Sequence, residues 1–383
     1  MTSAYLTQPH GHEGFREVQM NELRRNPITQ KWIIYPLNSS KLSELMVALR
    51  RTGSFTRVCK HECSLCSADL SAREILRLSN GRVYPRRNYG TSVPEPWDVR
   101  VVAALEPLFG IDGQFVRRPE RIYDVMSGYG ASELILADSK HDVSWYELND
   151  LRIRDVLVAV VERMKDLRLD TNMGHSHFFV NVGVEAGARF GHGYGELIVA
   201  PFVPEYIQRE LEAARQHFLQ RERCLFCDIL DEELRRQAIG KPTRIVTLTR
   251  DYMTLVPFFC DHPFEMWIIP RSHASDFTST PAPLLHSLAK MLVNALERIQ
   301  NALGDLPLTI TLMNQPNRAW GVERGYWTNI EHDWHWRMRI IPHLPPGCDT
   351  MRGFIFGTGS VVNAVLPERA VDILRSGASS SFL

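Results

Sequence analysis

The sequence predicts an α+β fold made of two similar halves, each an antiparallel sheet with one long helix packed on it. Three observations support this prediction. Strand-like runs recur in the same order in both halves, a helix-like stretch lies between them in each half, and each half carries a Cys-x-x-Cys pair followed by histidines. We therefore expect a pseudo-dimer within one chain of 383 residues, which is long enough for two hydrophobic cores.

The recurring strands carry matched landmarks. An apolar run that ends in asparagine occurs twice, as Phe178–Asn181 and Thr311–Asn314. Another strand-like run begins with a glutamate eight residues before a histidine, as Glu133–His141 and Glu265–His273. The order of these landmarks places the boundary between the halves near residue 205.

The expected helices fall between these strands. Apolar residues recur at helical spacing over 148–167 and over 283–303. A helix over 205–221 is expected to join the halves, and a short one to begin at Pro367 and end before Gly377. We therefore divide the chain into a polar N-terminal segment, two domains and a tail, with the bounds 1–19, 20–204, 205–376 and 377–383.

Composition excludes several classes of function. Lysine plus arginine and aspartate plus glutamate both number 44, so the chain has no excess basic charge for nucleic acid. No apolar run approaches the roughly 20 residues of a membrane-spanning helix, and the N-terminus lacks the apolar stretch of a signal peptide. The seven cysteines fit thiolates on metal in a reducing cytoplasm better than disulfides. We expect a cytoplasmic protein with a small-molecule substrate and no nucleic-acid or membrane partner.

The cysteine pairs and the histidines at matched landmarks predict two zinc sites. Two cysteines three positions apart lie on one tight turn, and histidines from distant strands can complete a tetrahedron. Because four protein ligands leave no position open, both zinc ions are expected to be structural. The predicted ligand sets are Cys63, Cys66, His141 and His192 in the first half, and Cys224, Cys227, His273 and His335 in the second.

The last ligand of the second site has competitors. His262, His332 and His343 are alternatives to His335, and His332 lies only three residues before it. We prefer His335 because it occupies the position in the second half that His192 occupies in the first.

An ordered set of motifs runs through the chain: Leu23–Thr29 with Trp32, Cys63–Cys66, Ser139–Asp142, Asn181–Ala188, Cys224–Cys227, Pro263–Glu265, Pro270–His273 and Gly357–Gly359. Together, over about residues 20 to 376, they resemble the galactose-1-phosphate uridylyltransferases, which belong to the histidine-triad superfamily. Single motifs of this set are not specific, whereas their order is.

This resemblance implies two histidine-triad-like domains, commonly in a homodimer, with zinc at the positions named above. It also implies ping-pong nucleotidyl transfer, in which a histidine attacks the α-phosphorus of a UDP-sugar or related nucleotide. Arg337, on a strand of the second half, is a further candidate for phosphate contact, with a solvated strand face as the alternative. The candidates for nucleotide or phosphate binding are Arg24, Arg25, Asn26, Asn181, Gly187 and Arg337.

The chain departs from the family's pattern where the chemistry is expected. In the run Gly-Ala-Ser-x-x-His-Pro-His-Gly-Gln, the nucleophilic histidine, the glutamine and the phosphate-contacting serine correspond here to Tyr194, Glu196 and Arg189. A tyrosine has a pKa of about 10 and needs a base or a cation to become a phenolate. Ionised Glu196 cannot donate to phosphate, whereas Arg189 can offset its charge. These three residues are the predicted catalytic residues, with a packed core tyrosine at Tyr194 and a local ion pair between Arg189 and Glu196 as the alternatives.

Three functions are compatible with these changes. The first is an atypical or repurposed enzyme that acts on a nucleotide, sugar phosphate or related substrate, with Tyr194 as nucleophile or general acid/base. The second is an active nucleotidyltransferase of the family that uses a Tyr-linked or a direct route. The third is a non-catalytic binding or scaffold protein that keeps its zinc sites because folding needs them.

Overall fold

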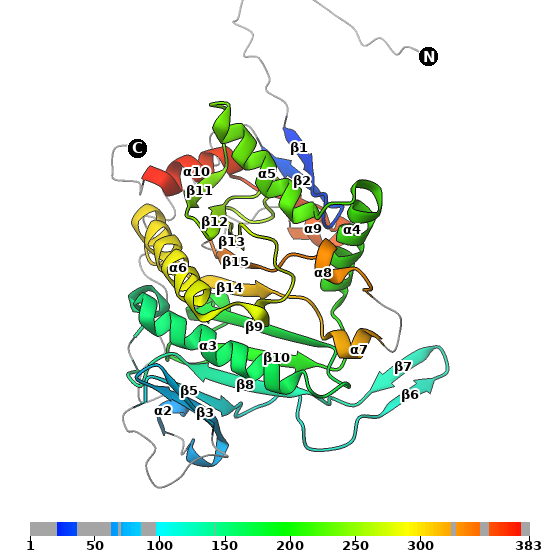
Figure 1. Cartoon of the computed structure of the whole chain (residues 1–383), viewed down its shortest axis with the longest axis vertical. Helices are drawn as coiled ribbons and strands as arrows, with labels where there is room; N and C mark the ends of the chain where they lie inside the picture. Colours follow the sequence, from blue (N-terminus) through cyan, green and yellow to red (C-terminus); the bar gives the residue numbers. More distant parts are fainter. Residues whose placement is uncertain are drawn as a thin grey trace, which may run out of the picture.

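The computed structural model describes residues 21–36, 63–67, 70–85, 97–141, 143–322, 327–344 and 352–376. Within these residues it confirms the predicted α+β class, with long helices packed on a broad antiparallel sheet (Figure 1). The predicted N-terminal segment 1–19 and the tail 377–383 lie outside the described residues.

One sheet of eleven strands runs through both halves. The halves meet where β9 pairs with β14, with Asn181 opposite Thr309 and Val182 opposite Leu308. Residues from the two halves therefore lie next to each other at the centre of the sheet. In sheet order the strands are β11 (Ile245–Leu248), β12 (Tyr252–Leu255), β13 (Met266–Pro270), β15 (Arg337–Pro342), β14 (Leu308–Met313), β9 (His175–Val182), β10 (Tyr194–Ala200), β8 (Ala131–Leu136), β5 (Val99–Ala103), β3 (Glu74–Ser79) and β4 (Arg82–Pro85).

Two long helices, α3 (Asp150–Leu167) and α6 (Ala282–Leu303), lie side by side on one face of this sheet, as Figure 1 shows. Both were predicted from apolar spacing. In α6 the buried residues Leu285, Leu288 and Leu292 follow the three- and four-residue spacing of one helix face. The apolar core between these helices and the sheet is the largest in the described chain.

The remaining helices cover the ends and the opposite face of the sheet. The predicted helices appear as α4 (Glu205–Arg221) and α10 (Pro367–Ser376), whereas α5 (Leu225–Ala238) was not predicted. No helix among the described residues is both long enough and apolar enough to span a bilayer. The short elements are α2 (Ser64–Ser67), α7 (Arg318–Val322), α8 (Ile330–Asp333), α9 (Arg352–Thr358), the three-stranded sheet of β1 (Glu22–Arg25), β2 (Trp32–Tyr35) and β16 (Val361–Val362), and the hairpin of β6 (Arg117–Glu120) and β7 (Tyr123–Met126).

The two glutamates at matched positions of the sequence repeat point to opposite faces of the sheet. Glu133 on β8 accepts two hydrogen bonds from Arg163 of α3, at 2.7 and 2.8 Å, on the helix-covered face. Glu265, its counterpart in sequence, instead accepts from Arg339 of β15 at 2.7 Å and from the indole of Trp267 at 2.8 Å. Successive strand residues point to opposite faces, so an offset of one residue moves a side chain to the other side of the sheet.

Candidate functional site

The first Cys/His cluster lies at one end of β8 and β10. Short helix α2 carries Cys66, and the loops after β8 and before β10 carry His141 and His192. The Cys66 sulfur lies 3.2 Å from Nδ1 of His141 and 3.1 Å from Nε2 of His192. With Cys63, one ligand atom from each residue lies within 4.8 Å of all the others. The four predicted ligands of the first site are therefore brought together.

The second cluster repeats this arrangement. Cys224 precedes α5 and Cys227 lies in its first turn, while the two histidines follow β13 and precede β15. The Cys227 sulfur lies 3.3 Å from Nδ1 of His273 and 3.6 Å from Nδ1 of His335. His332, the sequence alternative, stacks on the ring of Phe218. The cluster that the structure assembles is therefore the predicted one with His335.

Both clusters are suited to hold one metal ion each. A tetrahedral ion with bonds of about 2.0 to 2.3 Å to nitrogen and sulfur needs ligand atoms separated by less than about 4 Å. The distances from the Cys66 and Cys227 sulfurs to the imidazoles lie in that range. In the second cluster, Nε2 of His273 lies 2.8 Å from the carbonyl oxygen of Glu331, which leaves Nδ1 for the ion.

The thiol of Cys227 is set up for ionisation. Its hydrogen bond with Cys224, together with the two imidazoles, lowers the pKa of Cys227, while the same hydrogen bond, together with burial, raises the pKa of Cys224. A thiolate is the form that binds metal. The second cluster therefore already supplies one thiolate, in a geometry that suits a divalent ion.

Tyr194 is packed in a small apolar cluster with Cys63 and Phe190. Its phenol oxygen accepts a hydrogen bond from the backbone N–H of Arg189 at 2.9 Å, and its ring meets that of Phe190 edge-on at 5.3 Å. Its side chain is only 2% exposed, and this burial raises the pKa of the phenol. The phenol is therefore neutral at pH 7 and holds the loop that carries Arg189.

Arg189 and Glu196 form an ion pair beside this phenol. The guanidinium donates to the carboxylate at 2.6 Å. Glu196 is almost fully buried on β10, whereas the side chain of Arg189 is 41% exposed. The pair thus places a cation at the surface that is tied to a buried anion, and the three predicted catalytic residues lie together.

Asn181 and Gly187 are close to each other at the end of β9. Gly187 has a φ of +94°, and a Cβ added there would lie 3.4 Å from the side-chain nitrogen of Asn181. The Asn181 side chain accepts from the hydroxyl of Thr309 at 3.0 Å, across the junction of the halves. Thr309 also lies 2.8 Å from Nε2 of His343. The positive φ at position 187 is what requires glycine in this loop.

The other predicted phosphate ligands make contacts elsewhere within the described chain. Arg24 donates to both oxygens of Glu368 at 3.1 and 3.0 Å, and so ties β1 to α10. The Asn26 side chain accepts from two backbone N–H groups of its own turn, and Arg25 is exposed. Arg337 is buried against Glu210 of α4. Sequence reasoning could not show which neighbours would occupy these side chains.

His175, at the start of β9, belongs to none of the sites predicted from the sequence. It is buried, and neither of its ring nitrogens has a partner among the described residues. Burial first, and the nearby ring of His177 second, lower the pKa of His175 to about 3. The spacing of residues in the sequence does not indicate that a histidine will be buried without a hydrogen-bond partner.

The pKa of His175 predicts an acid sensitivity. In the unfolded chain the group titrates near pH 6.5, so its stabilisation is complete above that value and is lost as pH falls toward about 3. We expect His175→Leu to reduce the loss of unfolding free energy between about pH 7 and about pH 4.5, measured by urea denaturation at each pH. An equal loss in the variant and the wild type would show that His175 does not contribute.

No protein-family model matches the sequence. The chain is similar to ADP-glucose phosphorylase of Arabidopsis thaliana, with 22% identity over 365 residues, 94% of this chain and 93% of the relative. It is also similar to galactose-1-phosphate uridylyltransferase of Thermotoga maritima, with 22% identity over 363 residues, 93% of this chain and 98% of the relative.

Two solved structures have the same fold over nearly the whole chain. One is the ADP-glucose phosphorylase of Arabidopsis thaliana with bound ADP-glucose, with a TM-score of 0.72 and 21% identity over 94% of this chain and 99% of that one. The other is a uridylyltransferase mutant, with a TM-score of 0.66 and 21% identity over 94% of this chain and 97% of that one.

Proposed function

The homologues of this chain are galactose-1-phosphate uridylyltransferase-like proteins, and from this we infer that it is an atypical enzyme of that kind, acting on a sugar nucleotide or a sugar phosphate. The relative with bound ADP-glucose supports the substrate class. The assembled segment 181–196 supports the location, because Asn181, Arg189 and Glu196 lie on or beside neighbouring strands at the centre of the sheet.

The two Cys/His clusters are proposed to hold Zn²⁺. Two thiolates and two imidazoles are a donor set that zinc prefers, and four protein ligands close the coordination shell. Zinc in these positions supplies folding energy and leaves the chemistry to side chains. Its second-half ligands join α5 to β13 and β15, and its first-half ligands join α2 to the ends of β8 and β10.

The observation that carries the mechanism is the packing of Tyr194. A nucleophilic tyrosine must lose its proton, but burial raises the pKa of this phenol, and its oxygen already accepts the N–H of Arg189. We therefore assign a direct route to this enzyme. A phosphate oxygen of the acceptor forms the new bond to the α-phosphorus of the sugar nucleotide, and the bond to the sugar 1-phosphate breaks, so that no nucleotidyl group is attached to the protein.

In this route Arg189 is the group that contacts phosphate. Its guanidinium is partly exposed and is held by Glu196, so a bound phosphate shares the cation with the carboxylate. Tyr194 positions Arg189 through the backbone, and Glu196 positions its side chain. A homodimer and a cytoplasmic location complete the proposal, and sedimentation of the purified protein tests the first of these.

Tyr194→Phe is the variant that separates the routes. With ADP-glucose or UDP-glucose and inorganic phosphate or a hexose 1-phosphate, we expect this variant to lose less than about tenfold in turnover, well below the cost of removing a general acid or base. Arg189→Gln is expected to lose about 10²–10³-fold, the cost of one transition-state donor. Turnover is followed by release of sugar 1-phosphate, with intact-mass spectrometry on the same samples.

Arg209→Gln is the matched control, since it breaks an exposed arginine–glutamate pair of the same 2.6 Å length on α4. It is expected to leave turnover unchanged. A nucleotidyl mass adduct that Tyr194→Phe abolishes would replace the direct route by a Tyr-linked one. Absence of both turnover and nucleotide binding in the wild type would refute the proposed function and favour a scaffold protein.

A further inference from the structure

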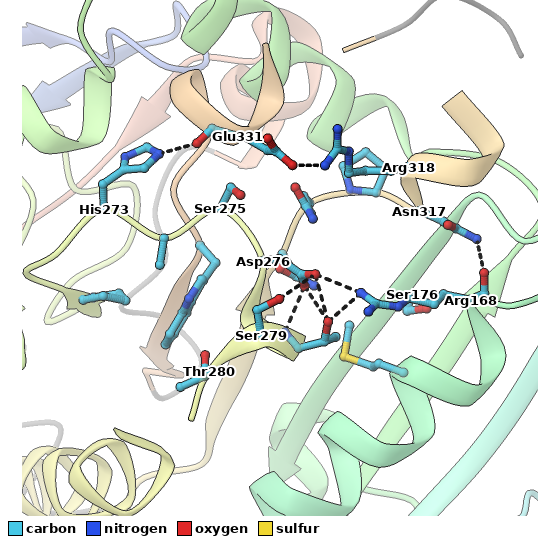
Figure 2. A pocket seen from close by; sticks show the side chains of 18 of the residues that line it. Arg168, Ser176, His273, Ser275, Asp276, Ser279, Thr280, Asn317, Arg318 and Glu331 are labelled. Carbon is cyan, nitrogen blue, oxygen red and sulfur yellow. Dashed lines mark hydrogen bonds and ion pairs between the residues drawn. The ribbon is translucent and has the colours of Figure 1, made fainter. Parts of the chain in front are cut away.

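We propose that a cavity beside the second Cys/His cluster binds a neutral, polyhydroxylated molecule such as a sugar. The cavity has a volume of about 750 Å³, within the range of small-molecule sites. It lies between the end of α3, the 272–281 loop and the 314–319 segment, and Figure 2 shows polar side chains from all three around it. This proposal does not depend on the chemistry proposed for the 181–196 segment.

The two arginines of the cavity are already paired with carboxylates, and a further carboxylate, that of Asp251, also lines it. Arg168 donates to Asp276 at 2.8 Å and to Thr278 at 2.6 Å. Arg318 is paired with the Glu331 carboxylate at the rim (Figure 2). Within the described lining, both arginines are therefore held by carboxylates. An anionic ligand would have to displace one of these, whereas an uncharged ligand would not.

Two buried polar atoms of the lining lack partners among the described residues. They are the indole Nε1 of Trp336, a side chain only 1% exposed, and the side-chain oxygen of Gln315, which is 8% exposed. One is a donor and the other an acceptor. Because a buried polar atom without a hydrogen bond is costly, such a site favours a ligand whose groups both donate and accept. The hydroxyl groups of a sugar do both.

The rest of the lining fits the same chemistry. Hydroxyl groups of Ser275, Ser279 and Thr280 surround the space, and Figure 2 shows them around its polar side. On another side Trp336 forms an aromatic wall, held edge-on by Phe277 at a ring distance of 5.1 Å. A sugar ring presents hydroxyl groups at its edge and C–H groups on its faces, which matches a wall of this kind beside polar groups.

The cavity is separate from the 181–196 segment. Trp336 directly precedes Arg337, whose side chain points away to Glu210 of α4. Likewise Ser176 lines the cavity, while its neighbour His177 points to the other face and contacts Thr311. Because successive residues of a strand face opposite sides, the cavity lies on the helix-covered face of the sheet. A ligand in the cavity and a ligand at the 181–196 segment therefore contact opposite faces of the sheet.

The test measures binding of glucose, galactose, maltose and glucose 1-phosphate to the full chain by calorimetry and saturation-transfer NMR. Trp336→Phe keeps the ring and removes the N–H, and Gln315→Met keeps the length and removes the amide. We expect the wild type to bind a neutral sugar and each variant to bind it at least about tenfold more weakly. Binding of UDP-glucose at the 181–196 segment is expected to be unchanged.

Trp334→Phe is the matched control. Trp334 is also fully buried, and its indole N–H has no hydrogen-bond partner in the described part of the chain, but it packs against Phe226 and does not line the cavity. Its variant is expected to bind the sugar as the wild type does. Three outcomes would each overturn the proposal. The first is an equal loss of sugar affinity in both tryptophan variants, and the second is no binding of any neutral sugar at millimolar concentration. The third is tighter binding of glucose 1-phosphate than of glucose at this cavity.

Discussion

Replacement of Glu210 by alanine is expected to lower the free energy of unfolding by about 3–5 kcal/mol, the cost of leaving a buried charge without its partner. Glu210 of α4 and Arg337 of β15 are 1% and 0% exposed. The guanidinium reaches both carboxylate oxygens, at 2.7 and 2.8 Å. Its other two nitrogens have no hydrogen-bond partner among the described residues. The Glu210 carboxylate is therefore the main group that offsets the cost of burying the charge of Arg337.

Aromatic rings enclose the rest of this guanidinium. Its central carbon lies 4.5 Å from the ring centre of Trp267 and 4.7 Å from that of Phe226. Such contacts are worth about 0.5 to 2 kcal/mol each, so they cannot replace the ion pair. Without Glu210, Arg337 has to leave the interior, and α4 has to separate from the sheet with it.

Glu212→Ala is the control for this prediction. Glu212 lies two residues further along the same helix, on its exposed side, and pairs with Arg215 in the i,i+3 geometry, where exposed pairs contribute about 0–1 kcal/mol. Urea unfolding of both variants checks the contrast. Similar midpoints for the two variants would mean that Arg337 finds another partner. Replacement of both Glu210 and Arg337 by leucine and methionine is expected to recover most of the loss.

The burial of Arg337 in this ion pair could not be predicted from the sequence. Two arginines on a strand, Arg337 and Arg339, resemble an exposed or phosphate-binding face, because lone charged residues are rarely buried. What buries Arg337 is α4, a helix whose position on the sheet no spacing pattern contains. The same holds for Arg24, whose partner Glu368 lies 344 residues away in sequence. Ion pairs between residues so far apart in the sequence are therefore seen only in the three-dimensional structure.

In contrast, the features that depend on residues close together in the sequence were predicted from local patterns. Helices α3 and α6 follow from apolar spacing, and the two Cys/His clusters follow from cysteine turns and strand-end histidines. The glutamates at the matched landmarks did not follow, because an offset of one residue in a strand exchanges the two faces. The cavity beside the second cluster was also missed, since its walls come from three distant segments.

Replacement of Cys227 by serine is expected to remove one of two bound zinc ions per chain and to destabilise the second half. Serine keeps the size of the side chain but is a poor zinc ligand, because zinc sites are built from thiolates, imidazoles and carboxylates. Cys227 is the residue that contacts both histidines, so its loss releases α5 from β13 and β15 together. Since binding of structural zinc contributes directly to folding, we expect at least about 3 kcal/mol of lost stability.

Metal analysis of the purified protein and thermal unfolding measure the two effects. Cys66→Ser is the corresponding substitution in the first half. It is expected to remove the zinc ion of the first cluster and to leave the ion of the second cluster in place. Cys260→Ser is the control, because this buried thiol donates to the carbonyl of His262 and belongs to neither cluster. It is expected to retain two ions per chain, so a loss of stability there has a different cause. If Cys227→Ser also retained two ions, the second cluster would not be a zinc site, and the anchoring of α5 would have to come from apolar packing alone.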